Sequence, residues 1–118
     1  MKTILLVEDD KNQLLLYKHE LSLEGYNIIT AQDGQEAVRK VNEELPDLIV
    51  MDINMPKMSG IESIGRILSK HKKIPIIINT AYSSYKDDFM SWSADAYIIK
   101  SSDLTELKDK IKELIGNV

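Results

Sequence analysis

The chain has 118 residues, close to the commonest domain size, so we expect a single domain over residues 1–118. Its composition, 43% hydrophobic and 29% charged, is typical of a globular protein, and no apolar stretch reaches the roughly 20 residues of a membrane helix. It has no cysteine, and its net charge of −4 argues against a nucleic-acid-binding surface. We therefore expect a cytoplasmic protein without disulfides, thiol catalysis, a membrane span or direct nucleic-acid contact.

Apolar runs alternate with amphipathic segments along the whole chain. The pattern predicts strands at 2–7, 27–31, 47–52, 75–79 and 95–99, and helices at 11–24, 34–44, 60–71, 84–92 and 104–116. Four pairs have capping-box spacing at predicted helix starts: Asp10 with Gln13, Asp33 with Glu36, Ser59 with Glu62, and Asp103 with Glu106. We expect a doubly wound α/β fold of the (βα)5 type, with a five-stranded parallel sheet of order 2-1-3-4-5.

Polar residues follow four of the predicted strands directly. Glu8–Asp10 follow the first strand and Asp52 ends the third, while Thr80 and Lys100 follow the fourth and fifth. The carboxyl ends of parallel strands meet at one edge of the sheet, where open α/β sheets bind ligands. Carboxylates, a hydroxyl and a lysine gathered there predict a site for a divalent cation and a phosphoryl group.

The acidic residues support this interpretation on chemical grounds. Asp9 and Asp10 are adjacent carboxylates that repel each other, and a divalent cation such as Mg²⁺ relieves the repulsion. Asp10 could instead serve only as a helix cap. Asp52 could be an ordinary turn residue, or a nucleophile that takes a phosphoryl group as an acyl phosphate.

Thr80 and Lys100 also have ordinary alternatives. Thr80 could be a simple strand residue, or a hydroxyl that hydrogen-bonds a phosphoryl oxygen. Lys100 could be a surface charge, or a point charge that holds the phosphoryl group. No single residue is specific, but the order of an acid pair, an acid, a hydroxyl and a lysine on successive strand ends is highly specific.

This arrangement resembles the receiver domain of two-component response regulators, a family that includes the single-domain chemotaxis protein CheY. The resemblance covers the whole chain and implies the flavodoxin/CheY-like fold. The motifs that carry it are Val7–Asp10, Asp52 followed by Met55–Gly60, Thr80-Ala81, and Ala94–Lys100.

The resemblance implies a role for each acidic position. Asp52 is implied as the phosphoacceptor. Asp9 and Asp10, with Asp52 and the backbone carbonyl of Asn54, are implied to hold Mg²⁺ or, in its place, Mn²⁺. Lys100 is implied to pair with the phosphoryl group.

The resemblance also implies partners and a switch. A sensor histidine kinase or a phosphotransfer protein would donate the phosphoryl group, and Thr80 and Tyr97 would form the switch. Phosphorylation would then change the face formed by the helix predicted at 84–92, the strand at 95–99 and the helix at 104–116. That face would signal to a target protein or to an output domain absent from these residues, or form a phosphorylation-dependent homodimer.

Three positions depart from the family pattern. Ser101 replaces the usual proline, which predicts either a trans bond with a reshaped loop or a strained cis bond. Ser93 replaces a usual glycine, so a left-handed turn there would be strained. Tyr82, two residues after Thr80, is bulky and predicts slow autodephosphorylation.

Three other functions share parts of the pattern. A haloacid-dehalogenase-like phosphatase would need an acid two residues after Asp52, where this chain has Asn54. A flavodoxin-like FMN carrier would need a phosphate-binding loop where Glu8–Asp10 would repel phosphate. A receiver-like module that is never phosphorylated would not need the full set of residues. We therefore expect catalysis only of the chain's own phosphorylation and dephosphorylation, and no enzyme activity on an outside substrate.

Overall fold

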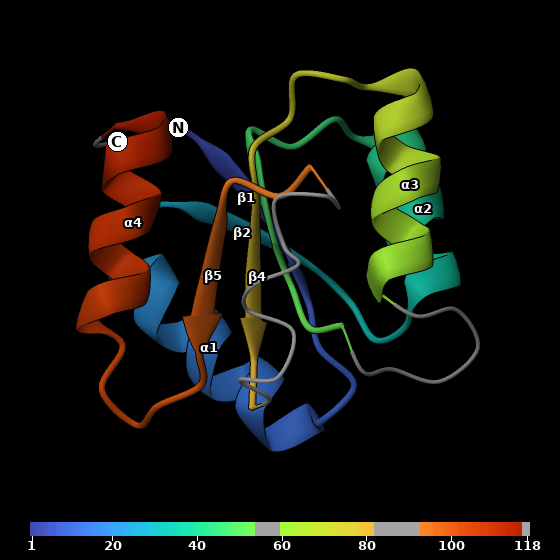
Figure 1. Cartoon of the computed structure of the whole chain (residues 1–118). Coiled ribbons are helices and arrows are strands. Elements are labelled where there is room, and N and C mark those ends of the chain that lie inside the picture. Colours follow the sequence, from blue (N-terminus) through green and yellow to red (C-terminus); the bar gives the residue numbers. More distant parts are fainter. Residues whose placement is uncertain (54–59, 82–92, 117–118) are drawn as a thin grey trace.

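The computed structural model describes residues 1–53, 60–81 and 93–116 (Figure 1). In chain order the elements are β1 (Thr3–Val7), α1 (Lys11–Leu23), β2 (Asn27–Ala31), α2 (Gly34–Glu43), β3 (Leu48–Met51), α3 (Gly60–Lys70), β4 (Ile76–Thr80), β5 (Ala96–Ile99) and α4 (Thr105–Ile115). The helix predicted at 84–92 lies outside the described residues, so α4 here denotes the last helix of the chain. The predicted bounds of the other elements agree with these to within one residue.

The five strands form one parallel sheet of order β2-β1-β3-β4-β5, which confirms the predicted fold class. β1 lies between β2 and β3 in the sheet. Val7, its last residue, is therefore opposite both Ala31 and Met51. In Figure 1, α1 and α4 cover one face of the sheet, and α2 and α3 cover the other. In Figure 1, β4 and β5 point toward the lower edge of the view. Because all neighbouring strands are parallel, the residues that follow the strands lie at one edge of the sheet.

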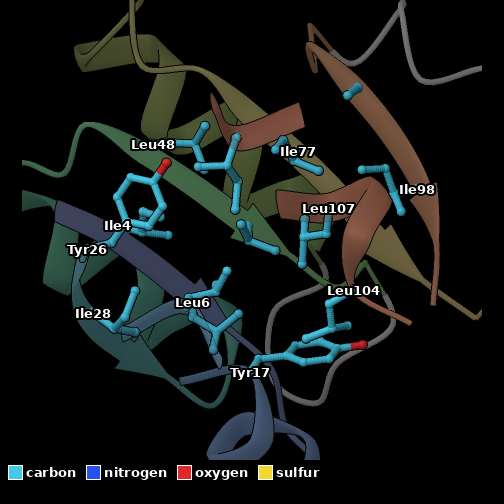
Figure 2. Close-up of a cluster of buried hydrophobic side chains, with 14 of the residues drawn as sticks. Ile4, Leu6, Tyr17, Tyr26, Ile28, Leu48, Ile77, Ile98, Leu104 and Leu107 are labelled. Atoms are coloured by element: carbon cyan, nitrogen blue, oxygen red, sulfur yellow. The ribbon is translucent and has the colours of Figure 1, made fainter. Parts of the chain in front are cut away.

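Alternate strand residues fill two separate cores, one on each face. On β1, Ile4 and Leu6 belong to the cluster under α1 and α4, whereas Leu5 and Val7 belong to the cluster under α2 and α3. Figure 2 shows the first cluster, with Leu107 and other helix side chains packed over the sheet. Because both faces of the sheet are covered by helices, the strands are nearly continuous apolar runs. The polar residues at the strand ends are therefore attached to a tightly packed sheet.

Two of the predicted helix caps are present. The Asp10 carboxylate accepts hydrogen bonds from the backbone N–H groups of Asn12 and Gln13 at the start of α1. The Asp33 carboxylate accepts one from the N–H of Glu36 at the start of α2. These bonds satisfy amide groups that would otherwise lack partners in the first turn of each helix. The predicted cap at Ser59 lies outside the described residues.

The predicted capping box of Asp103 with Glu106 is wrong. The N-cap residue of α4 is Leu104, which makes no side-chain capping bond. Asp103 Oδ1 instead accepts hydrogen bonds from the N–H of Thr105, at 3.0 Å, and from its hydroxyl, at 2.6 Å. The helix begins two residues after Asp103, so the spacing to Glu106 does not match the observed start.

Two of the unusual positions can be compared with expectation. The described residues contain no cis peptide bond, so the Lys100–Ser101 bond is trans, which is the first of the two predicted alternatives. Ser101 Oγ accepts a hydrogen bond from the N–H of Asp103. Ser93 has a φ of 64°, the left-handed conformation that glycine adopts without strain. Tyr82 lies outside the described residues.

No helix in the described ranges has both the length and the apolar character to cross a membrane.

Candidate functional site

Asp52 lies at the carboxyl edge of the sheet, immediately after β3. Its backbone N–H donates to the carbonyl of Val7 at 3.1 Å, which keeps the end of β3 aligned with β1. Its side chain is buried, with a residue exposure of 7%, and Oδ2 accepts a hydrogen bond of 3.0 Å from Lys100 Nζ. Asp52 is therefore a nearly buried carboxylate whose charge is balanced by a specific cation.

Lys100 bridges two carboxylates across the edge of the sheet. Its backbone N–H donates to the Thr80 carbonyl at 2.8 Å, which extends the pairing of β4 and β5 and fixes the start of the side chain. Its ammonium lies 2.6 Å from Glu8 Oε1 and 3.0 Å from Asp52 Oδ2. Burial alone would lower the pKa of Lys100, but the hydrogen bonds and charges of Glu8 and Asp52 outweigh burial and raise it. Lys100 is thus protonated and forms ion pairs with both carboxylates.

Glu8 is the second buried carboxylate of the site, with an exposure of only 2%. Its N–H donates to the Ala31 carbonyl at 3.0 Å, so the β1–β2 pairing continues one residue past Val7. Its Oε2 accepts a hydrogen bond from the N–H of Asp10. Burial raises the pKa of the Glu8 carboxyl above its usual range, although the hydrogen bond from Lys100 acts in the opposite direction.

Three carboxylates converge at this edge: Glu8, Asp9 and Asp52. Each offers one oxygen, and these oxygens all lie within 4.8 Å of one another. Hard divalent cations such as Mg²⁺ prefer oxygen ligands of this kind, so the cluster could hold a metal ion. The carboxylates repel one another, and Lys100 balances only part of their charge, which further favours a cation.

Asp10, which the sequence paired with Asp9, is not in this cluster. Its carboxylate caps α1, as described above, because the backbone at Asp10 turns out of the strand into the helix. We therefore revise the acidic pair from Asp9 and Asp10 to Glu8 and Asp9. The capping-box spacing from Asp10 to Gln13 was the signal that could have identified this, since a carboxylate committed to a cap is a poor metal ligand. Asn54 lies outside the described residues.

The two proposed switch residues are both buried. Thr80 ends β4 with no exposed surface, and its carbonyl accepts the Lys100 N–H described above. Tyr97 lies in β5 opposite Ile78, is 6% exposed, and packs in the core cluster under α2 and α3. Thr80 therefore shares the edge with Asp52 and Lys100, whereas Tyr97 lies deeper, in the packed interior.

The revised acidic pair makes a direct prediction for metal binding. We expect Glu8→Gln to weaken Mg²⁺ binding at least roughly tenfold, since even residues that only support metal ligands typically contribute that much. Asp10→Asn should leave Mg²⁺ affinity and stability nearly unchanged, because asparagine caps helices as well as aspartate does. Isothermal titration calorimetry with Mg²⁺ measures both. A larger loss of Mg²⁺ affinity in Asp10→Asn than in Glu8→Gln would instead support Asp9 and Asp10 as the metal-binding pair.

Comparison with known proteins agrees with this fold. The family model for the response regulator receiver domain matches residues 4–112. The chain is 34% identical over 116 residues to the alkaline phosphatase synthesis transcriptional regulatory protein PhoP of Bacillus subtilis, covering 97% of this chain and 48% of that protein. It is 37% identical over 117 residues to the response regulator ArlR of Staphylococcus aureus, covering 98% of this chain and 53% of that protein. The chain thus spans about half the length of these curated relatives.

Solved structures are similar over nearly the whole chain. The response regulator TrrA of Thermotoga maritima, in complex with Mg²⁺-BeF, is 48% identical with a TM-score of 0.92, covering 97% of this chain and 99% of that one. A second structure holds TrrA in complex with the histidine kinase ThkA, with 48% identity and a TM-score of 0.90, covering 98% and 99%.

Fold and site together define a doubly wound α/β domain with a lysine-bridged acidic site at the carboxyl edge of its sheet. The chain belongs to the family of response regulator receiver domains of two-component systems.

Proposed function

We propose that Asp52 accepts a phosphoryl group from a phosphorylated histidine of a sensor kinase or phosphotransfer protein. The observation that carries this proposal is the buried Asp52 carboxylate, held by a lysine that also binds Glu8. The histidine kinase complex of the similar protein TrrA supports the class of donor.

The residues of the site suit this chemistry. The Asp52 carboxylate attacks phosphorus and forms an acyl phosphate, while the leaving group departs with its electron pair. The Lys100 ammonium is already 3.0 Å from Asp52 Oδ2, where the added phosphoryl charge would develop. Because the ammonium is positioned before the reaction, little reorganisation is needed to stabilise that charge.

Glu8, Asp9 and Asp52 would hold Mg²⁺, with Mn²⁺ as an alternative and the carbonyl of Asn54 as a further ligand. The oxygen donors of the three described carboxylates fit either ion. When bound, the ion supplies positive charge that offsets the repulsion between the carboxylates and the phosphoryl oxygens.

We further propose that the phosphoryl group is sensed by the Thr80 hydroxyl and by Tyr97. Their response would change the face formed by residues 84–92, β5 and α4, which would signal to a target protein, an output domain or a second copy of the chain. The transcriptional regulators among the relatives, about twice as long as this chain, support an output domain. The chain would turn over no outside substrate.

The test is uptake of a phosphoryl group from acetyl phosphate, followed by intact mass. We expect a phosphoryl-sized mass gain that needs Mg²⁺, is lost with excess chelator and is absent in Asp52→Asn. Folding of the variant is checked by circular dichroism. A folded wild-type protein that gains no mass with Mg²⁺ present, or an equal gain in Asp52→Asn, would contradict the proposal.

A further inference from the structure

A groove of about 330 Å³ lies at the amino edge of the sheet, at the opposite end of the strands from Asp52. Two segments form it, residues 45–47 before β3 and residues 71–75 before β4. In Figure 1, the chain from α3 to β4 crosses the upper edge of the view, away from the edge toward which β4 and β5 point. The groove therefore belongs to a different surface from the site around Asp52.

Part of the groove lining is apolar. Its apolar members are Leu45, Pro46, Ile74 and Pro75. Leu45 is 60% exposed, so much of its side chain is available for contact with another molecule. An apolar side chain of a partner that covered Leu45 would gain free energy in proportion to the apolar area removed from water.

A second groove, of about 240 Å³, lies between α2 and α3 and adjoins the first. It is lined by Val38, Val41, Asn42, Arg66, Ile67, Ser69 and Lys70. His71 lines the first groove, and its Nε2 lies 3.2 Å from Oδ1 of Asn42, which lines the second. The two grooves thus meet at this pair of residues, and we call them together the amino-edge surface.

The amino-edge surface is basic, although the chain as a whole has a net charge of −4. Its charged lining residues are Arg66, Lys70, Lys72 and Lys73, with Asp47 as the single carboxylate among the residues that line the two grooves. Asp47 Oδ2 already accepts a hydrogen bond of 2.7 Å from the N–H of Thr3. In the part of the chain that the structure describes, no ion pair includes Lys70, Lys72 or Lys73. Three ammonium groups are thus available to the carboxylates of another molecule.

We propose that the amino-edge surface binds an acidic peptide segment of a partner protein. An apolar side chain of the segment would cover Leu45, while its carboxylates would pair with Lys70, Lys72 and Lys73. Charge complementarity supports this occupant, because a surface that combines cations with an apolar residue matches acidic residues next to an apolar one. A nucleic acid would be repelled by the net negative charge of the chain. A lipid surface is usually bound by about four to eight clustered basic residues, more than the three lysines here.

The position of the amino-edge surface has a consequence for signalling. A peptide bound there would contact neither Asp52 nor Lys100, which lie at the carboxyl edge of the sheet. We therefore expect binding to be independent of phosphorylation, so that the partner remains docked in both states of the chain. This contact goes beyond the proposed function of Asp52 and does not depend on it.

The experiment titrates the isotope-labelled protein with a short synthetic peptide in which one leucine is flanked on both sides by glutamates. Amide chemical shifts locate the peptide and give its affinity. We expect the largest shifts at residues 45–47 and 70–75. The affinity should fall as salt is added, because salt screens ion pairs at a surface.

Charge reversal tests the contribution of the lysines. Lys72→Glu/Lys73→Glu should weaken peptide binding at least about fivefold, because two attractions become repulsions. The matched control is Lys11→Glu/Lys18→Glu, which makes the same change in net charge at two exposed lysines of α1. Its affinity should stay within about twofold of wild type. Circular dichroism checks that both variants are folded.

Leu45→Ser tests the apolar contact. It should weaken binding at least about threefold. A control peptide with alanine in place of the leucine should bind the wild type about as weakly, and Leu45→Ser should then have little further effect, as expected for two groups in contact. Asp52→Asn should bind the leucine peptide with wild-type affinity, and Lys72→Glu/Lys73→Glu should take up phosphoryl from acetyl phosphate at the wild-type rate.

Several results would overturn the proposal. They are no binding of the leucine peptide to the wild type up to about 5 mM, shifts confined to other residues, equal weakening in the two double variants, and equal affinity for the alanine peptide. Vesicles containing phosphatidylglycerol that bind the wild type but not Lys72→Glu/Lys73→Glu, with no peptide binding, would assign the surface to a membrane instead. Failure of the wild type to take up phosphoryl would contradict the proposed function of Asp52 and leave this surface unaffected.

Discussion

Replacing Lys100 by methionine is expected to lower the free energy of unfolding by about 3 kcal/mol at neutral pH without divalent cations. Methionine keeps much of the side-chain volume but removes the ammonium that lies between Glu8 and Asp52. The two buried carboxylates then face each other without a counter-charge, and such uncompensated charges are costly. Urea unfolding, followed by circular dichroism, measures the change.

Two conditions should reduce this loss. Added Mg²⁺ should stabilise Lys100→Met more than it stabilises the wild type, because the cation replaces the missing charge. Lower pH should also help, since burial raises the pKa of Glu8 in the folded state. A carboxyl with a raised folded-state pKa stabilises the fold when protonated, and that stability is lost as pH rises through the folded-state pKa. The deficit of Lys100→Met should therefore shrink on acidification.

Lys108→Met provides the matched control for a lysine in an ion pair. Lys108 lies 3.2 Å from Glu20, and both side chains are partly exposed, so its loss should cost less than about 1 kcal/mol. If Lys100→Met were no more destabilising than Lys108→Met, or did not respond to Mg²⁺, the view of Lys100 as the counter-charge of a buried acidic site would be wrong.

Gly60→Ala is expected to destabilise the fold by about 3 kcal/mol and to disturb the site. A Cβ at Gly60 would lie 2.5 Å from the Asp52 carbonyl oxygen and 2.6 Å from Ile53 Cα, both backbone atoms. The Gly60 N–H also donates to the Ile53 carbonyl at 3.1 Å, so the start of α3 is held against the segment that carries Asp52. The added methyl group must therefore displace either the start of α3 or the segment that carries Asp52.

Gly65→Ala is the matched control in the same helix. A Cβ at Gly65 would meet no atom within 4 Å, and alanine favours a helix interior over glycine by about 1 kcal/mol. We expect Gly65→Ala to raise the free energy of unfolding by up to that amount, whereas Gly60→Ala lowers it and slows phosphoryl uptake. Equal stabilisation by both substitutions would show that the close approach at Gly60 does not constrain the Asp52 segment.

The sequence was sufficient to predict the sheet order and the residues that meet at its edge. Both follow from periodicity and topology, because parallel strands must bring Asp52, Thr80 and Lys100 to one side. The orientation of the acids at positions 8–10 was harder to predict. It depends on where β1 stops pairing, and the bond from Glu8 N to the Ala31 carbonyl extends that pairing by one residue.

One further feature could not be obtained from the sequence pattern. The Lys100 ammonium lies 2.6 Å from Glu8 Oε1, and this second ion pair depends on how deeply both side chains are buried, which sequence spacing does not encode. Conversely, the glycine of the Met55–Gly60 motif was evident in the sequence, but the structure supplied its physical reason.

Locating the phosphoryl group on the chain tests the central claim most directly. After brief incubation with acetyl phosphate and Mg²⁺, reduction with borohydride converts an aspartyl phosphate to homoserine, which peptide sequencing by mass spectrometry can place. The account predicts homoserine at position 52 and none in the protein incubated without Mg²⁺. A phosphoryl group found on another residue, with position 52 unchanged, would contradict the assignment of Asp52 as the acceptor.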